Sequence, residues 1–294
     1  MTNELQAYIK ERKIQIDKHL DLLLIPKYPQ KIYESIRYSI FAGGKRLRPI
    51  LMFLSFELFS SNIEKIIDFA VSIELIHTYS LIHDDLPSMD NDSYRRGMPT
   101  NHIVFGEGLA VLAGDALLNL AAENILKSIV KFGYSKEMID AALYIFNCSG
   151  IDGMIGGQVV DILNQGKLIN KDELELLHLN KTSKLIQASV VAGSLIGGAE
   201  EKIVKKLEEY AKYLGLAFQI RDDILDYIGD EEKLGKSIGK DQKNQKTTYV
   251  SMYGLEESQK LVDKYSNISI DIIKTIDNKG LLTELTNSLI YREQ

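Results

Sequence analysis

Apolar residues recur at helical spacing along most of this sequence. Between positions 32 and 40, apolar and small residues fall at i, i+3 and i+4, and the segment from 70 to 77 repeats the pattern. Two longer stretches, 172–196 and 202–228, extend this period over several turns, which predicts long helices, the first of them entered at Asp172. Alternation typical of strands is rare. The pattern therefore predicts an all-α protein.

Glycine and proline indicate where these helices end. Glycines fall at 43–44, 97, 106–108, 166, 197–198 and 229–239, and the five prolines all lie at or before position 99. Proline removes a helical hydrogen bond and clashes with the preceding turn, so the proline-free stretch from 100 to 294 permits long helices. With roughly ten or more helices of ordinary length, no fixed-period repeat and no linker, we predict a single domain over residues 1–294.

Composition then restricts the classes of function and location. The chain has 35 Lys and Arg against 41 Asp and Glu, a net charge of −6, which is not the basic surface of a general nucleic-acid binder. Its single cysteine, Cys148, excludes an internal disulfide and fits a reducing compartment. We find no run of about 18 uncharged apolar residues and no signal-peptide pattern near the N-terminus. These features predict a cytoplasmic protein without a membrane span.

Two clusters of aspartates, each within an apolar helical pattern, are the strongest chemical signal in the chain: Asp84, Asp85 and Asp90, and Asp222, Asp223 and Asp226. In the second cluster, Gln219, Asp222 and Asp226 share one helical face. In the first, six residues separate Asp84 from Asp90, a spacing that does not return to the same face. We therefore expect the helix to end or distort at Pro87, which would bring Asp90 back toward the pair.

Adjacent carboxylates repel each other unless a cation neutralises them. Sets made only of carboxylates favour a hard, oxygen-seeking ion, most simply Mg²⁺, which is typically shared between carboxylates and substrate phosphates. Two such clusters facing each other predict Mg²⁺ ions that bridge a polyphosphate. The alternative for either cluster alone is a solvated acidic helix end.

Several groups of cations stand beside these clusters or beside glycines, as a phosphate site requires: Lys45, Arg46 and Arg48, Arg95 and Arg96, Lys181 and Lys184, Lys236, and Lys246. Glycine permits close backbone approach and arginine offers a fork to phosphate oxygens. Gly235-Lys236-Ser237 does not complete a P-loop, because the upstream glycine is displaced and no strand precedes it.

The chain resembles the trans-isoprenyl diphosphate synthases, specifically the bacterial farnesyl diphosphate synthases. The resemblance runs from about Tyr33 to Tyr249 and rests on six motifs in order: GGKRLRP at 43–49, SLIHDDLPSMDNDSYRRG at 80–97, GGQVVD at 156–161, KTSKLI at 181–186, FQIRDDILD at 218–226 and LGKSIGKD at 234–241. It implies the all-α isoprenoid synthase fold, with a deep central cavity between helices, and a homodimer. It also implies Mg²⁺-dependent head-to-tail condensation of an allylic diphosphate with isopentenyl diphosphate.

The resemblance also implies roles for individual residues. Three Mg²⁺ ions would hold the allylic diphosphate between Asp84, Asp85 and Asp90 and Asp222, Asp223 and Asp226, not all of which need be direct ligands. Arg95, Lys181, Lys236 and Lys246 would contact the allylic diphosphate, and Lys45, Arg48, His77 and Arg96 would bind isopentenyl diphosphate. Thr182 and Gln219 would stabilise the carbocation, and Gln158 and Asp161 would line the cavity. Arg221 departs from the family pattern, where a neutral residue stands before the second aspartate pair.

Product length is expected to depend on residues one turn before Asp84, which would form the floor of the pocket. Tyr79 and Ser80 occupy these positions. With an aromatic residue at position 79, the chain resembles bacterial C15 synthases. The residues therefore favour farnesyl diphosphate, made from dimethylallyl diphosphate through geranyl diphosphate. The alternatives are a geranylgeranyl or geranyl diphosphate synthase, an HD-type phosphohydrolase suggested by His77 and His83-Asp84, a class I terpene cyclase, and a non-catalytic synthase subunit.

Overall fold

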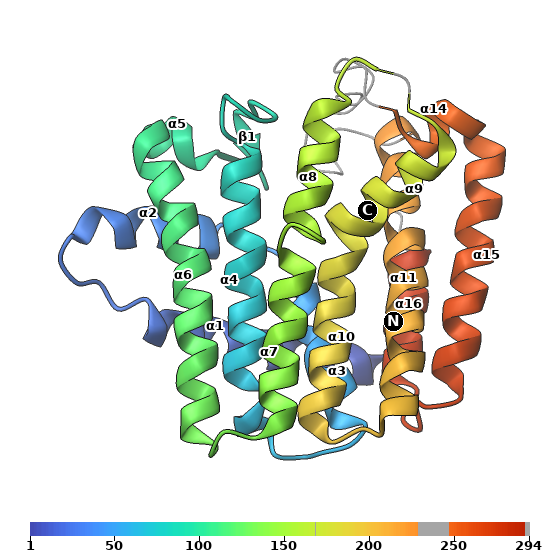
Figure 1. The fold of residues 1–294 in the computed structure, drawn as a ribbon, viewed down its shortest axis with the longest axis horizontal. Coiled ribbons are helices and arrows are strands. Elements are labelled where there is room, and N and C mark those ends of the chain that lie inside the picture. Colours follow the sequence, from blue (N-terminus) through green and yellow to red (C-terminus); the bar gives the residue numbers. More distant parts are fainter. Residues whose placement is uncertain (168, 229–246, 292–294) are drawn as a thin grey trace.

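Helices form nearly all the regular structure of the computed structural model, which describes residues 1–167, 169–228 and 247–291 (Figure 1). The first half contains α1 (Asn3–Leu23), α2 (Gln30–Phe41), α3 (Leu47–Glu57), the 3-10 helix η1 (Ile63–Lys65), α4 (Ile67–Asp84), α5 (Asn101–Phe105), α6 (Glu107–Lys131) and α7 (Lys136–Ser149). The second half contains α8 (Met154–Leu163), α9 (Lys171–His178), the π-helix η2 (Leu179–Ser183), α10 (Lys184–Gly197), α11 (Glu201–Ile228), α14 (Tyr249–Tyr253), α15 (Leu255–Lys274) and α16 (Leu281–Ile290). The all-α prediction is confirmed.

A short hairpin follows the first aspartate cluster and was not expected from the sequence. Its strands, β1 (Tyr94–Arg95) and β2 (Met98–Pro99), pair antiparallel. Arg96 and Gly97 make the two-residue turn with φ of 54° and 74°, the positive values that such tight hairpin turns require. The hairpin carries Arg95 and Arg96 back toward the end of α4.

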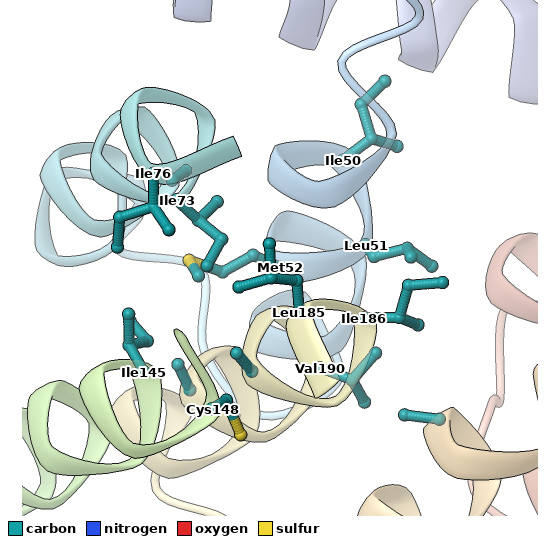
Figure 2. Packing of buried hydrophobic residues seen from close by; sticks show 14 of the residues in the cluster. Ile50, Leu51, Met52, Ile73, Ile76, Ile145, Cys148, Leu185, Ile186 and Val190 are labelled. Carbon is teal, nitrogen blue, oxygen red and sulfur yellow. The ribbon is translucent and has the colours of Figure 1, made fainter. Parts of the chain in front are cut away.

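The core is built around α4, which packs against α6 and α3 and also contacts α1, α2 and α10 (Figure 1). Ile67, Phe69, Ile73, Ile76 and Ile82 are among its buried side chains. Figure 2 shows apolar side chains of α3, α4, α7 and α10 meeting at one such contact. Because α4 is covered on most sides, packing fixes the position of its C-terminal end.

The second long helix, α11, packs against α15, α10 and η2, and α1 contacts α16 near the other end of the chain. The buried residues of α11 include Leu207, Tyr210 and Leu214, as the pattern over 202–228 predicts.

The prediction of one continuous helix over 172–196 needs a correction. The helix begins at Lys171, where Asn170 and Glu173 form a capping box, and a π-helical turn interrupts it at 179–183.

Two helical segments, Ile63–Asp84 and Glu107–Lys131, are long and apolar enough by length and composition to cross a membrane. In the most apolar part of the first, 72% is buried inside the molecule, as in the core helix of a globular fold, and the share in the second is 39%. Core helices satisfy the same criterion, so it is weak support for a membrane span.

Candidate active site

A cavity of about 420 Å³ lies at the C-terminal end of α4, between α3, α6, α8, η2 and α10. It brings together nine of the residues singled out in the sequence: Arg48, His77, Tyr79, Ser80, His83, Asp84, Gln158, Lys181 and Thr182. Apolar side chains complete the wall, among them Leu118 of α6, Met154, Ile155, Val159 and Ile162 of α8, and Leu185 of α10. The cavity therefore combines polar and charged side chains with an apolar wall.

The first aspartate cluster folds back on itself, as predicted from Pro87. α4 ends at Asp84, and the backbone N–H of Asp90 donates to the carbonyl of Asp84 at 2.9 Å. The N–H of Asp92 likewise donates to the carbonyl of Asp85 at 3.2 Å. The turn thus places the third aspartate of the motif beside the first.

The two paired aspartates of this cluster have different surroundings. Asp85 is buried and accepts three hydrogen bonds of 2.6–2.9 Å from the guanidinium of Arg95. Asp84 lines the cavity, where burial raises its pKa to about 6; Lys181 opposes this shift and Asp90 adds to it. Asp84 is therefore a carboxylate that would be stabilised by a cation.

The second cluster lies on α11, and its three aspartates also differ in burial and in hydrogen-bond partners. Asp223 is 5% exposed and accepts from the amide nitrogen of Gln219 at 2.9 Å and from the backbone N–H of Tyr249 at 3.0 Å. Asp226 is buried, whereas Asp222 is partly exposed. Arg221 donates to Gln259 of α15 at 3.3 Å. The side chain of Arg221, the residue that departs from the family pattern, thus bonds to a neighbouring helix.

The π-helix η2 carries Lys181 and Thr182 to the cavity wall. The hydroxyl of Thr182 donates to Gln219 at 2.7 Å, and the ammonium of Lys181 lies 2.6 Å from a carboxylate oxygen of Asp161. A Cβ at Gly157 of α8 would lie 2.4 Å from the backbone nitrogen of Lys181, so only glycine lets α8 approach η2 this closely. π-turns are frequent at functional sites, but residue spacing alone did not reveal this one.

The segment Gly43–Pro49 separates its three cations into three environments. Lys45 is exposed. Arg46 is 3% exposed and bonds to Asp17, to Glu74 and to the carbonyl of Ile40 at 2.7–2.9 Å, so it joins α1, α2 and α4. Arg48 lines the cavity, and its buried Nε has no hydrogen-bond partner in the described part of the chain. Only Arg48 of the three is thereby placed on the cavity wall.

Several cations share a small region near Arg48. Burial lowers the pKa of Arg48 to about 10, with Glu74 opposing and Arg96 adding to the shift. Burial and the neighbouring Arg48 and Arg96 also hold the pKa of His77 well below its usual value, so its imidazole is neutral. Arg96 donates to the carbonyl of Gly43 and lines, with Arg95, a smaller cavity of about 30 Å³ on another side of α4. Such a group of arginines is suited to an anion.

The site does not assemble a metal centre from protein groups alone. Within residues 1–167, 169–228 and 247–291, no three His, Cys, Asp or Glu side chains converge closely enough to hold a metal ion. This disfavours the HD-type phosphohydrolase, in which His77, His83 and Asp84 would share a metal. Mg²⁺ commonly uses one or two carboxylates with substrate phosphates, and the desolvated Asp84 and the unpaired buried amide of Gln158 fit such a shared site.

Some expected residues stand apart from the main cavity. Its lining, within the described parts of the chain, does not include Lys45, Asp85, Asp90, Arg95, Arg96, Gln219 or the aspartates of α11. The expectation that Asp161 lines the cavity is also wrong, since only Gln158 of that pair does so and Asp161 instead holds Lys181. Lys236 and Lys246 lie outside the described residues. Sequence reasoning missed the apolar wall of α8, although Ile155, Val159 and Ile162 recur at helical spacing. It also missed the contact between Asp223 and Tyr249, which no local pattern indicates.

Comparisons with known proteins agree with this geometry. The family model described as "Polyprenyl synthetase" matches residues 29–276. A "Geranylgeranyl diphosphate synthase" of Cyanophora paradoxa is 46% identical over 94% of this chain and 92% of its own, and a "Farnesyl diphosphate synthase" of Bacillus subtilis (strain 168) is 38% identical over 100% of both. A solved structure, a "geranyltransferase" from Legionella pneumophila, superposes with a TM-score of 0.86 at 32% identity, covering 98% of each chain.

These likenesses confirm both the resemblance seen in the sequence and the isoprenoid synthase fold that it implied. The matched region includes the cavity, both aspartate clusters and η2. The chain belongs to the polyprenyl synthetase family of prenyltransferases.

Proposed function

We propose that this prenyltransferase condenses isopentenyl diphosphate head-to-tail with dimethylallyl diphosphate and then with geranyl diphosphate, giving farnesyl diphosphate as its final product. Its relatives include both farnesyl and geranylgeranyl diphosphate synthases. The choice between these two product lengths therefore depends on the residues that line the cavity. The observation that carries the proposal is Tyr79, a bulky side chain that lines the cavity and is only 5% exposed. A growing prenyl chain would meet this ring.

Cations in and around the cavity support binding of two diphosphates. We assign isopentenyl diphosphate to Lys45, Arg48, His77 and Arg96, because the unpaired buried Nε of Arg48 offers a donor that an anion would satisfy. We assign the allylic diphosphate to Arg95, Lys181, Lys236 and Lys246. Arg95 and Lys181 are themselves held by Asp85 and Asp161, which fixes these cations before the substrate arrives.

Magnesium ions, three by family resemblance, would neutralise the charge that develops on the leaving diphosphate. We infer that Asp84, Asp90 and Asp222 hold these ions. Asp85 and Asp223 are better described as positioning residues, because Arg95 engages the first and Gln219 and Tyr249 engage the second. Asp226 is buried on α11, one turn after Asp222 and Asp223.

In the proposed reaction, the allylic C–O bond breaks to leave a carbocation and diphosphate. The double bond of isopentenyl diphosphate attacks the cation, the new C–C bond forms, and a proton leaves to the departing diphosphate. The oxygens of Thr182 and Gln219, joined at 2.7 Å, present dipoles toward the cation. The apolar wall from α8 and α10 excludes water, which would otherwise quench the cation.

We further propose that the chain acts in the cytoplasm as a homodimer of single-domain subunits spanning residues 1–294. Leu112, Leu126 and Val130 of α6 and Leu143 of α7 each expose more than half of their surface. An apolar face of this kind on two neighbouring helices suits a second copy of the chain. Light scattering of the purified protein would test the dimer, and a monomer at micromolar concentration would contradict it.

Incubating the protein with Mg²⁺, isopentenyl diphosphate and either dimethylallyl or geranyl diphosphate, followed by sizing of the products, tests the activity. We expect farnesyl diphosphate from both starters, and no elongation with either would overturn the proposal. The Tyr79→Ala variant should release longer products. Tyr265→Ala, which removes a buried aromatic ring from α15, is the matched control and should not change product length.

A further inference from the structure

His83 is a prominent residue of the first motif that the proposed reaction does not use. It stands four residues after Tyr79 on α4, and the two rings meet edge to face, with centroids 5.7 Å apart and planes at 82°. Both side chains line the main cavity. His83 is therefore in contact with the residue that we propose limits chain growth.

The ring of His83 is fixed from the side of α6. Its Nε2 lies 3.0 Å from the carbonyl of Val111, so in the neutral ring this nitrogen carries the proton and donates it. A Cβ at Gly114 would lie 2.0 Å from Nε2 and 2.4 Å from Cδ2 of the same ring. The imidazole thus occupies a slot in α6 that exists only because residue 114 has no side chain.

The side chain of Tyr79 has fewer polar contacts to fix its position than that of His83. Its hydroxyl is buried and has no hydrogen-bond partner among the residues that the structure describes, so packing determines where the ring stands in the cavity. The neighbouring Ser80 hydroxyl bonds back to the carbonyl of His77 at 2.9 Å and so is directed along its own helix. The orientation of Tyr79 then depends on the neighbouring side chains.

We propose that His83 is a positioning residue for product length: seated in the Gly114 slot and bonded to Val111, it holds the ring of Tyr79 across the cavity. This inference rests on the proposed elongation activity. The inference predicts that substitutions at residues 83 and 114 change product length in opposite directions. A smaller residue at 83 gives Tyr79 room to swing aside and lengthens the cavity, whereas a methyl group at 114 displaces His83 toward Tyr79 and shortens it.

The test sizes the products of wild-type protein, His83→Ala, His83→Gln and Gly114→Ala, each with Mg²⁺, isopentenyl diphosphate and dimethylallyl diphosphate. We expect the ratio of geranylgeranyl to farnesyl product to rise about tenfold in His83→Ala, in line with the discrimination a hydrophobic pocket gives per small group. Gln can place a nitrogen near the position of Nε2, so His83→Gln should restore the wild-type ratio. Gly114→Ala should shift the products toward geranyl diphosphate.

Asn124→Ala is the matched control, because Asn124 bonds α6 to Asp68 and Ser72 at the other end of the same α4–α6 contact. It should weaken the fold and leave product length unchanged; a change in length as large as that of His83→Ala would overturn the inference. Unchanged ratios in both His83→Ala and Gly114→Ala would do the same. If wild-type protein makes no prenyl product, the proposed function itself fails, so the two failures are distinguishable.

The Mg²⁺ concentration for half-maximal rate separates this role from damage to Asp84. A variant that only disturbs the metal-binding turn should need more Mg²⁺ and keep farnesyl diphosphate as its product. That result for His83→Ala would contradict positioning of Tyr79. Should His83→Ala fail to fold, Gly114→Ala still tests the contact, and a product distribution equal to that of wild-type protein would then overturn the inference.

Discussion

The hydroxyl of Thr182 donates a hydrogen bond of 2.7 Å to the side-chain oxygen of Gln219, which joins η2 to α11 across the edge of the cavity. The amide nitrogen of Gln219 in turn donates to Asp223 at 2.9 Å. Because both ends of the amide are engaged, its oxygen has one defined orientation. The two dipoles proposed to stabilise the carbocation are therefore set before substrate binds.

Thr182→Val should break this link with little change in side-chain volume. We expect kcat to fall about a hundredfold, the lower end of the range for losing one oriented dipole in a catalytic site, with a smaller change in KM for isopentenyl diphosphate. Steady-state kinetics measures both. Thr182→Ser keeps the hydroxyl and should retain most of the activity; equal losses in Ser and Val would show that the hydroxyl is not the relevant group.

Asp84 and Asp85 should differ when each is changed to Asn. Asp84→Asn removes a carboxylate that lines the cavity, so we expect a large loss of kcat and a higher Mg²⁺ requirement. Asp85→Asn removes the negative charge and one of the two oxygens that accept from Arg95, and it should lower the free energy of unfolding by up to about 1.5–3 kcal/mol, the range for hydrogen bonds to charged groups. Magnesium titrations and urea denaturation separate the two, and identical Mg²⁺ curves would contradict the distinction.

Gly157→Ala should disrupt the site through the backbone. The new methyl group would lie 2.4 Å from the nitrogen of Lys181, so α8 and η2 must separate, and we expect a loss of stability of about 1–3 kcal/mol together with reduced kcat. Gly108→Ala is the control, because a Cβ there meets nothing within 4 Å. It should be neutral or slightly stabilising, as alanine favours helix. Equal effects at both positions would argue against the close approach.

Histidine burial should make stability depend on pH. Burial lowers the pKa of His178 to about 3, below the ordinary value of 6.5. The unfolded chain therefore binds a proton that the folded chain refuses, and this contribution to stability is lost as pH falls from about 6.5 toward 3, by at most about 1.4 kcal/mol per pH unit. Urea denaturation at several pH values should show that the free energy of unfolding changes less steeply with pH in His178→Asn than in wild-type protein. An unchanged pH dependence would contradict this role of His178.

Arg46→Met should test the buried ion pairs that support the Gly43–Pro49 segment. Removing the guanidinium leaves Glu74, itself 1% exposed, without its partner, and breaking such a buried pair costs about 3–5 kcal/mol. Thermal or urea denaturation measures this loss. Lys205→Ala removes an exposed i, i+4 pair with Glu201 and should leave stability unchanged, so a similar loss there would contradict the assignment.

Local signals in the sequence were sufficient for much of this protein. The helical period predicted α11 nearly to its ends, because a surface helix must present one apolar stripe to the core. The fold-back of Asp90 onto Asp84 was predicted from Pro87 alone, since six residues and a proline are incompatible with one straight helix. Motif order was enough to indicate the family.

Only the tertiary structure decided which like residues have unlike roles. Asp84 and Asp85 are neighbours of the same type, yet the hairpin carries Arg95 back to engage one of them while the other lines the cavity. Likewise Arg46 lies inside the fold and Arg48 at the cavity, although both belong to one cationic segment. Helical period assigns a residue to a face, but its partner comes from a distant part of the chain, and hydrogen bonding and burial, which set each group's charge state, arise only when those parts are packed together.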